Sequence, residues 1–417
     1  MSTNQLQLTP IFLPRPAPST RPPAPPLPSE LLFDILRLAT TNTTCDYSEP
    51  FDPQQTRVAF SGVCRGWNRV AAAQPTLVVK GAGQALRLAS VIREKHAKLR
   101  TAKTLHLIIR DGVQDPERRT EVPYERCDGF AEVIEACPKV RHVELDIPYR
   151  DDLELSRPLL ETLQKCKLSS FEVSGVCAMP EQALQRLLKA WRTLKQLVIP
   201  HLRLHCYRPQ LYSPLSLPFL RRLDFPLASS NHQPLLGNLL TLSPPNLRIF
   251  RAHAYHYPFF VDREAAASLV DGVAPQLHTF SYQDDPRQPS LSRWTFEPIV
   301  MRMTQLKVLA ISAHLIRAST FLEEVASKLV HLERLALLDS DRLTSYISAD
   351  SVLVFLEALP SLRLLHLAEP LLRFWDDEEW DEVCEKTGAK GIELLEDWQP
   401  TYDEDLNTWV PDEDLVK

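Results

Sequence analysis

The chain has 417 residues, too many for one ordinary domain unless the length comes from repetition. Apolar residues make up 44% of it, which is enough for a core, and the formal net charge of -6 points to no class of partner. No run of eighteen apolar residues occurs and the first thirty residues lack a secretory-signal pattern, so we expect no membrane contact and a cytoplasmic or nuclear location.

Residues 1–26 form a proline-rich leader. Nine prolines fall between residues 10 and 28, and each fixes φ and removes a backbone donor. This composition excludes helix and central strand, so we expect a disordered or polyproline-like segment.

Residues 27–75 have the pattern of a small helical module. Leu31, Leu32, Ile35 and Leu36 give the first part an apolar face at helical spacing. A second helical run covers residues 56–73 after a polar loop. Two or three short helices bury little by themselves, so this module is expected to need a partner surface.

Residues 76–375 contain a repeated phrase: an apolar residue, two variable residues, an apolar residue, one variable residue and another apolar residue. From residue 140 on, successive phrases start 26 to 30 residues apart. The phrases are Ala102-Leu105-Leu107, Val140-Val143-Leu145, Leu168-Phe171-Val173, Leu194-Leu197-Ile199, Leu220-Leu223-Phe225, Leu247-Phe250-Ala252, Leu277-Phe280-Tyr282, Leu306-Leu309-Ile311, Leu332-Leu335-Leu337 and Leu362-Leu365-Leu367.

This period lies at the upper edge of the leucine-rich-repeat range, in which each unit is a strand plus a helix. Helical spacing between phrases predicts helices over 183–191, 321–329 and 352–359. We therefore predict an α/β fold: a small N-terminal helical module followed by an irregular leucine-rich-repeat-like α/β solenoid. A conventional parallel α/β sheet is the alternative.

The end of the chain is acidic. From Asp376 to Lys417 there are sixteen Asp or Glu residues and three Lys, so this part carries -13 and the preceding part +7. Trp380, Val383 and Cys384 at helical spacing predict a capping segment over 376–395. Residues 396–417 are expected to form an acidic tail, either disordered or lying along the body.

The N-terminal module resembles the F-box. The matching residues are Leu27-Pro28-x-Glu30-Leu31-Leu32-x-x-Ile35-Leu36 and, some thirty residues later, Val63-Cys64-Arg65-x-Trp67. The repeat region is similar in pattern to the divergent leucine-rich-repeat bodies of many fungal F-box proteins.

The resemblance implies a substrate-recognition subunit of a Skp-cullin-F-box type ubiquitin ligase, which docks a Skp-type adaptor, and through it cullin, by the F-box and a protein substrate by the repeat body. By position, it implies that the adaptor is bound by Leu27, Pro28, Leu31, Leu32, Ile35, Val63, Cys64 and Trp67. The alternative is a non-ligase repeat scaffold for protein–protein interaction with a degenerate F-box cap.

Motifs for catalysis and metal binding are missing. The sequence has no glycine-rich phosphate loop, GxSxG elbow, HExxH or kinase signature. We interpret residues 201–206, with two histidines and a cysteine between Pro200 and Pro209, as a loop and not a metal site. The eight cysteines form no CxxC pair, and most of them are expected to be buried free thiols. We therefore expect a non-catalytic protein with no cofactor and no metal.

In a solenoid of this kind the variable residues of the strand phrases line the concave, ligand-binding face. Nine of these residues are basic and four are acidic. Three histidines, His142, His278 and His366, occupy further variable positions. Arginine suits carboxylate and phosphate, so we expect an acidic or phosphorylated protein substrate. The candidate substrate-binding residues are Arg141, Lys195, Arg221, Arg222, Arg248, Arg251, Arg334 and Arg363, with Lys307 in an equivalent slot and Glu144, Glu172, Asp224 and Glu333 as the acids.

Two alternatives to this interpretation stay open. In the first, the arginines simply solvate a polar sheet face and bind no partner. In the second, the acidic tail of the same chain covers that face. Nucleic acid is not the expected partner, because the whole chain is acidic and contains no DNA- or RNA-binding module.

Overall fold

The computed structural model divides the chain into two compact units, Met1–Ala73 and Gln74–Lys417. It describes residues 76–94, 99–109, 128–147, 153–205, 215–226, 246–253, 270–283, 293–316, 318–338, 347–372, 374–395, 401–403 and 408–410. The proline-rich leader, the F-box-like module and all eight adaptor-binding candidates lie outside these residues.

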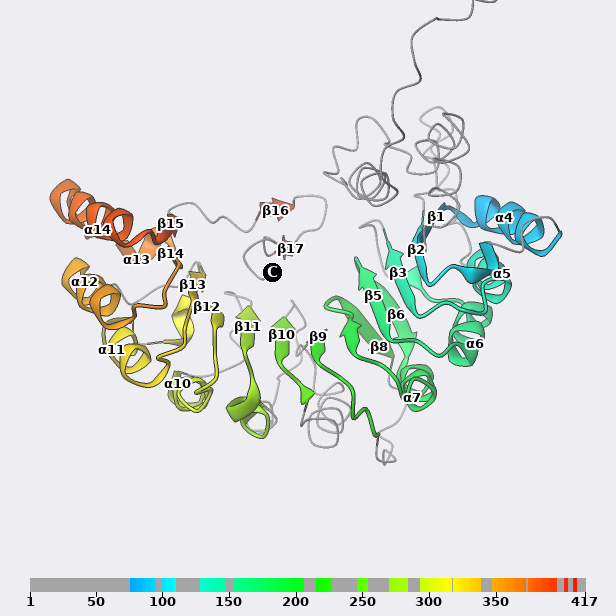
Figure 1. The fold of residues 1–417 in the computed structure, drawn as a ribbon, viewed down its shortest axis with the longest axis horizontal. Helices are drawn as coiled ribbons and strands as arrows, with labels where there is room; N and C mark the ends of the chain where they lie inside the picture. The colour runs from blue at the N-terminus through cyan, green and yellow to red at the C-terminus, as the bar shows by residue number, and fades with distance from the viewer. Residues whose placement is uncertain are drawn as a thin grey trace, which may run out of the picture. The chain divides into compact units, whose positions relative to one another are not determined.

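The second unit is built on a parallel sheet of twelve strands, in which each strand lies beside its predecessor along the chain (Figure 1). This consecutive order excludes a doubly wound sheet, whose strand order reverses. The strands are β1 Thr76–Lys80, β2 Thr104–Ile108, β3 His142–Asp146, β5 Ser170–Ser174, β7 Gln196–Val198, β9 Arg222–Pro226, β10 Ile249–His253, β11 Thr279–Gln283, β12 Val308–Ser312, β13 Arg334–Leu338, β14 Leu364–Leu367 and β15 Glu393–Leu395.

The longer described helices lie along one face of this sheet (Figure 1). Neighbouring helices are in contact, from α4 through α7 and from α11 through α12 to α14. Their bounds are α4 Ala82–Glu94, α5 Asp128–Ala136, α6 Arg157–Lys165, α7 Glu181–Ala190, α10 Arg293–Val300, α11 Ala318–Lys328, α12 Ala349–Ala358, α13 Glu369–Leu372 and α14 Asp377–Lys390, with 3₁₀ turns η1 Leu99–Thr101, η3 Ala274–Gln276 and η4 Ala313–Leu315.

All ten repeated phrases form consecutive strands, β2 to β14 of this sheet, which confirms the predicted α/β solenoid. The three apolar residues of each phrase are buried, with 4% exposure or less. The first of them closes a turn before the strand, as where Leu194 N–H donates to Trp191 O at 3.0 Å and Leu306 N–H to Met303 O at 2.9 Å. The predicted helices are α7, α11 and α12. The repeated phrase did not reveal β1 or β15.

A second, three-stranded parallel sheet contains β4 Leu153–Glu154, β6 Cys177–Pro180 and β8 Leu202–His205. The prediction of a loop at 201–206 was therefore wrong. Leu202 and Leu204 alternate into the interior with 2% and 8% exposure, and β8 gains its backbone partners from β6. Pro200 precedes the strand without interrupting it, so the two prolines do not exclude pairing.

The predicted capping segment contains α14, which begins with a capping box. Asp376 accepts from Glu379 N–H at 2.8 Å, and the Glu379 carboxylate accepts from Asp376 N–H at 3.2 Å. Gly391, at φ 66°, ends the helix in the left-handed conformation that favours glycine. Since β15 then pairs with β14, this segment adds a full helix–strand unit and not a closing helix alone. Further on, β16 Thr401–Asp403 and β17 Thr408–Val410 form an antiparallel hairpin.

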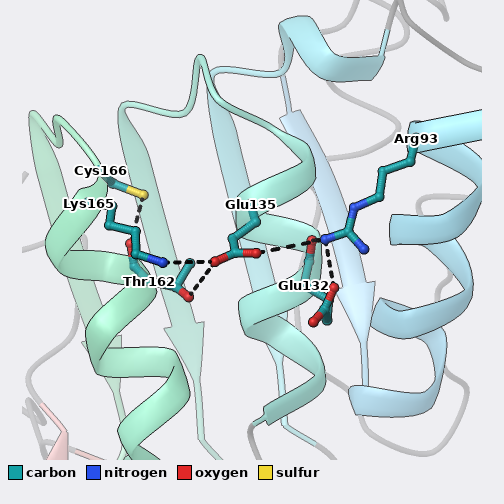
Figure 2. A network of polar contacts seen from close by, with 6 residues as sticks. All are labelled: Arg93, Glu132, Glu135, Thr162, Lys165 and Cys166. Atoms are coloured by element: carbon teal, nitrogen blue, oxygen red, sulfur yellow. Dashed lines mark hydrogen bonds and ion pairs between the residues drawn. The ribbon is translucent and has the colours of Figure 1, made fainter.

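Polar contacts join the outer surfaces of α4, α5 and α6 (Figure 2). Arg93 reaches Glu132 at 2.6 Å, and Lys165 reaches Glu135 at 3.2 Å, while Thr162 donates to the same Glu135 oxygen at 3.4 Å. The charged side chains are 42–71% exposed, so each such pair contributes about 0–1 kcal/mol. These contacts join neighbouring helices at the surface, while most of the stability comes from the buried residues beneath them.

The four cysteines within the described residues are free thiols: Cys137 and Cys177 are buried, as expected, whereas Cys166 and Cys384 are partly exposed. Burial raises the pKa of Cys137 and Cys166 to about 11 and that of Cys177 to about 12. A thiol with so high a pKa is a poor nucleophile at neutral pH, so these cysteines act as core residues.

Candidate binding surface

The eight predicted substrate-binding residues lie on three register positions of the large sheet. Arg222 and Arg334 are the first residues of β9 and β13, and Arg251 is the third residue of β10. The other five, which form a single row, each immediately precede a strand: Arg141, Lys195, Arg221, Arg248 and Arg363.

That row runs along the edge of the sheet at which the strands begin. Its neighbours are linked directly, because each residue donates its backbone N–H to the carbonyl of the residue before it in the row, at 2.6–2.9 Å. We call it the edge row, and it consists of Lys103, Arg141, Ser169, Lys195, Arg221, Arg248, His278, Lys307, Glu333 and Arg363.

The edge row concentrates positive charge, since seven of its ten residues are Lys or Arg. The backbones of adjacent strands are about 4.8 Å apart, and two unit charges at that spacing would repel by about 0.9 kcal/mol in water, which is the upper range for the longer side chains here. The effect is visible at His278, where burial and then the charges of Arg248 and Lys307 lower the pKa of the imidazole. The folded chain therefore holds together charges that repel each other.

Few of these charges are neutralised within the described part of the chain. Arg141 and Arg248 donate to the backbone carbonyls of Lys167 at 2.7 Å and Gln276 at 2.9 Å, which orients them without cancelling their charge. Lys307 forms an ion pair with Glu333 at 2.7 Å, and this hydrogen bond lowers the pKa of that carboxyl. The remaining cations of the row are available to an external anion.

The strand face beside the edge row is not uniformly basic, as the acids among its variable residues indicate. At its N-terminal end it is acidic, because Glu144, Asp146 and Glu172 lie on β3 and β5, with His106 on β2 within 4 Å of the first two. The count of charges along the sequence combined residues that precede the strands with residues inside them. In the sheet these two sets lie in separate rows.

The middle of the strand face contains a buried charged cluster. Asp224 is 3% exposed and accepts from Arg222 at 2.8 Å, while Arg251 lies 3.6 Å from the same carboxylate oxygen. These two arginines balance a carboxylate inside the protein, so they serve folding first and are poor candidates for a ligand.

The C-terminal end of the strand face is apolar and covered. Ala310, Ala336, Leu338 and Leu364 form a hydrophobic cluster there, and Leu395 packs against it. His366 was predicted to add positive charge to this face, but it is fully buried and its pKa falls to about 4. It is therefore neutral at physiological pH, because burial disfavours the charged imidazole.

Lys103 belongs to the edge row but was missing from the predicted site residues. It occupies the same slot of the first phrase, after Ala102, that Arg141 occupies in the next, so the phrase itself was the signal. Lys307 was recognised in its slot and lies in the row as well.

Two further searches cover only the residues given above. No helix in those ranges is long and apolar enough to cross a bilayer. Nor do three or more His, Cys, Asp or Glu side chains gather there as metal ligands would.

Two solved structures illustrate what this chain is similar to. No protein-family model matches the sequence, and no curated protein matches it. A chain of the TLR13–ssRNA13 complex is similar with 12% identity and a TM-score of 0.36 over 65% of this chain and 36% of that chain. The leucine-rich repeat-containing protein LegL7 from Legionella pneumophila is similar with 11% identity and a TM-score of 0.39, over 82% of this chain and 96% of that chain. This chain thus spans about a third of the length of the first of these structures. The fold assignment is based on the strand order and register of this chain alone.

Proposed function

We propose that this protein is a protein-binding scaffold whose solenoid holds an acidic segment of a partner along the edge row. We further propose that its N-terminal module docks a Skp-type adaptor, which would make the chain a substrate-recognition subunit of a ubiquitin ligase. The two parts of the proposal rest on different residues and are tested separately.

The observation that carries the first part is the edge row, with seven cations over ten adjacent strand starts. Folding brings these repelling charges together, and a polyanion that lies along the edge would relieve the repulsion. Arginine and lysine there can donate hydrogen bonds to carboxylates or phosphates. A protein segment is favoured over nucleic acid because the whole chain is acidic and its sequence contains no DNA- or RNA-binding module.

The test uses fluorescent peptides of twelve residues that alternate serine with glutamate, or phosphoserine with glutamate, and a lysine–serine control. Anisotropy should show binding of the two acidic peptides only, with weaker binding as salt rises. The variant Lys195→Glu/Arg221→Glu reverses two adjacent exposed charges of the row and should lose about tenfold in affinity, which is about 1.4 kcal/mol.

The matched control is Arg87→Glu/Lys189→Glu, which reverses two exposed charges on α4 and α7 and leaves the edge row intact. Equal losses in both variants would show that only net charge matters and would overturn the edge row as the site. Tighter binding of single-stranded RNA than of either acidic peptide would overturn the choice of partner.

The second part is supported by the F-box-like residues of the sequence, all of which lie outside the described structure. The test is capture of the purified full chain by the Skp-type adaptor, beside the variant Leu27→Ala/Pro28→Ala/Ile35→Ala. Capture of the parent chain and loss of capture in the variant would support a ligase receptor. Such a receptor raises the local concentration of a substrate near the ubiquitin-loaded E2 enzyme.

A third chain separates adaptor docking from a general loss of folding. Lys195→Glu/Arg221→Glu lies in the solenoid and should be captured by the adaptor as well as the parent. If the parent is not captured, the ligase role is wrong, and the chain is a repeat scaffold with a degenerate F-box cap.

A further inference from the structure

The large sheet changes character along its length. In β2 and β3 buried residues alternate with more exposed ones, as expected of strands with one covered face. In β12 and β13 every residue after the first is buried, and in β14 all four are. The C-terminal strands are therefore buried on both faces.

The second buried face is the hydrophobic cluster already described, which we call the inner patch: Ala310, Ala336, Leu338 and Leu364, with Leu395 packed against it. Leu338 and Leu364 are 2% and 7% exposed. Neighbouring strands shield a side chain sideways but not from above, and the longer helices lie on the opposite face (Figure 1). A further segment lying over the patch would account for this burial.

Residues 396–417, which we call the C-terminal segment, begin where the inner patch ends. Leu395 is both the last residue of β15 and part of the packing around the patch. The patch spans three strands, or about 10–15 Å, and an extended chain covers about 3.3 Å per residue, so the 22 residues of this segment reach across it easily.

The composition of the C-terminal segment suits an apolar surface with a basic border. It contains Trp398, Tyr402, Leu406 and Trp409, and the β16–β17 register places Tyr402 opposite Trp409. It also has eight acidic residues and one lysine.

The border of the patch carries three cations, one of which, Lys307, is paired with Glu333. Lys307 and Arg363 of the edge row precede β12 and β14, and Arg334 opens β13 between them. Aromatic residues in the C-terminal segment can contact the apolar patch while its carboxylates face these cations.

We propose that the C-terminal segment folds back within the same chain and covers the inner patch, with its acidic residues directed to the cationic border formed by Lys307, Arg334 and Arg363. The contact occupies the C-terminal end of the strand face and leaves Arg141, Lys195 and Arg221 of the edge row uncovered. It does not depend on the ligand proposed for that row.

The test is photocrosslinking in the full-length chain at low concentration. Trp409→p-benzoylphenylalanine should crosslink, after irradiation and digestion, to peptides that contain β12, β13 or β14. Val354→p-benzoylphenylalanine is the control, because Val354 is 61% exposed on α12 and should give no crosslink to the inner patch. Crosslinks from residue 409 only to other parts of the chain, or only to a second copy, would overturn the proposal.

A second measurement keeps the inference testable if the crosslinker disturbs the contact. Trp398→Ala/Trp409→Ala in the full chain should uncover the patch, and the pKa of His366, about 4 in the folded protein, should rise by about one unit or more toward 6.5 in an NMR titration. An unchanged His366 pKa in that variant would show that another segment covers the face. Binding of acidic peptides is not read in either experiment, so a failed ligand proposal does not affect them.

Discussion

A single glycine, Gly175, lies where the chain turns from β5 to β6 with a positive φ of 85°. A Cβ there would lie 2.1 Å from the backbone oxygen of Ile147. No side chain fits this turn, because both the left-handed backbone and the contact with a backbone atom oppose it.

We expect Gly175→Ala to lower the free energy of unfolding by about 2–4 kcal/mol, measured by urea denaturation. Gly388→Ala is the control. Gly388 lies inside α14, and a Cβ added to it would meet nothing within 4 Å, so alanine should raise stability there by about 0.5–1 kcal/mol. Equal effects at the two sites would contradict the steric argument.

The buried imidazole of His366 makes stability depend on pH. Its folded-state pKa of about 4 lies below the ordinary 6.5, so below pH 6.5 the unfolded chain binds a proton that the folded chain does not. Stability from this group is constant above about pH 7 and falls as the pH drops from 6.5 toward 4, with a loss of about 2 kcal/mol by pH 5.

The measurement compares the parent with His366→Gln in urea at pH 7.5 and pH 5.0. Carboxylates titrate in both proteins, so the difference between the two pH dependences isolates the histidine. The parent should lose about 2 kcal/mol more than the variant, and parallel pH dependences would show that His366 is protonated in the folded state.

At the scale of elements, the repeated phrase sets ten strands of the large sheet, and α12 and α14 begin with side-chain caps. Ser348 accepts from Ser351 N–H at 3.3 Å at the start of α12, and Asp376 and Glu379 form the capping box of α14. The capping box has consequences beyond the helix, because α14 leads directly into β15, the last strand of the sheet.

Asp376→Ala should cost about 1 kcal/mol of stability, since it leaves the Glu379 N–H without its cap. The loss should appear as faster hydrogen exchange in α14 and β15, with β5 and β7 unaffected. Asp377→Ala is the matched control, because it removes a first-turn charge but no capping bond and should cost a few tenths of a kcal/mol. Similar costs for the two variants would argue against the capping box.

At the scale of the whole solenoid, stability comes from each repeat stacking on the next. Phe280 of β11 illustrates this, since its ring centre lies 6.0 Å from that of Phe250 in β10 and 5.9 Å from that of Phe296 in α10. One side chain thus joins elements of neighbouring repeats.

Phe280→Ala should therefore lower the free energy of unfolding by about 3–5 kcal/mol, because it opens a cavity shared between repeats. Phe219, which is 53% exposed, is the control, and Phe219→Ala should stay within about 0.5 kcal/mol of the parent in calorimetry or denaturant unfolding. A loss at Phe280 no larger than at Phe219 would mean that contacts between repeats contribute little.

The sequence alone determined the strand phrases, the helices between them and the solenoid. These follow from spacing along the chain, because apolar residues such as Leu194, Leu197 and Ile199 must turn to one side of a strand wherever that strand lies. The edge strands β1 and β15 lack the full phrase, so the repeat could not reveal them.

The tertiary structure alone decided which variable residues meet. Arg221 and Arg248 became neighbours in a solvent-facing row, whereas Arg222 and Arg251 were drawn to the buried carboxylate of Asp224. His366, in a slot equivalent to that of Arg251, became neutral and buried. These outcomes depend on the register between strands some thirty residues apart and on what covers each face, which no local pattern specifies.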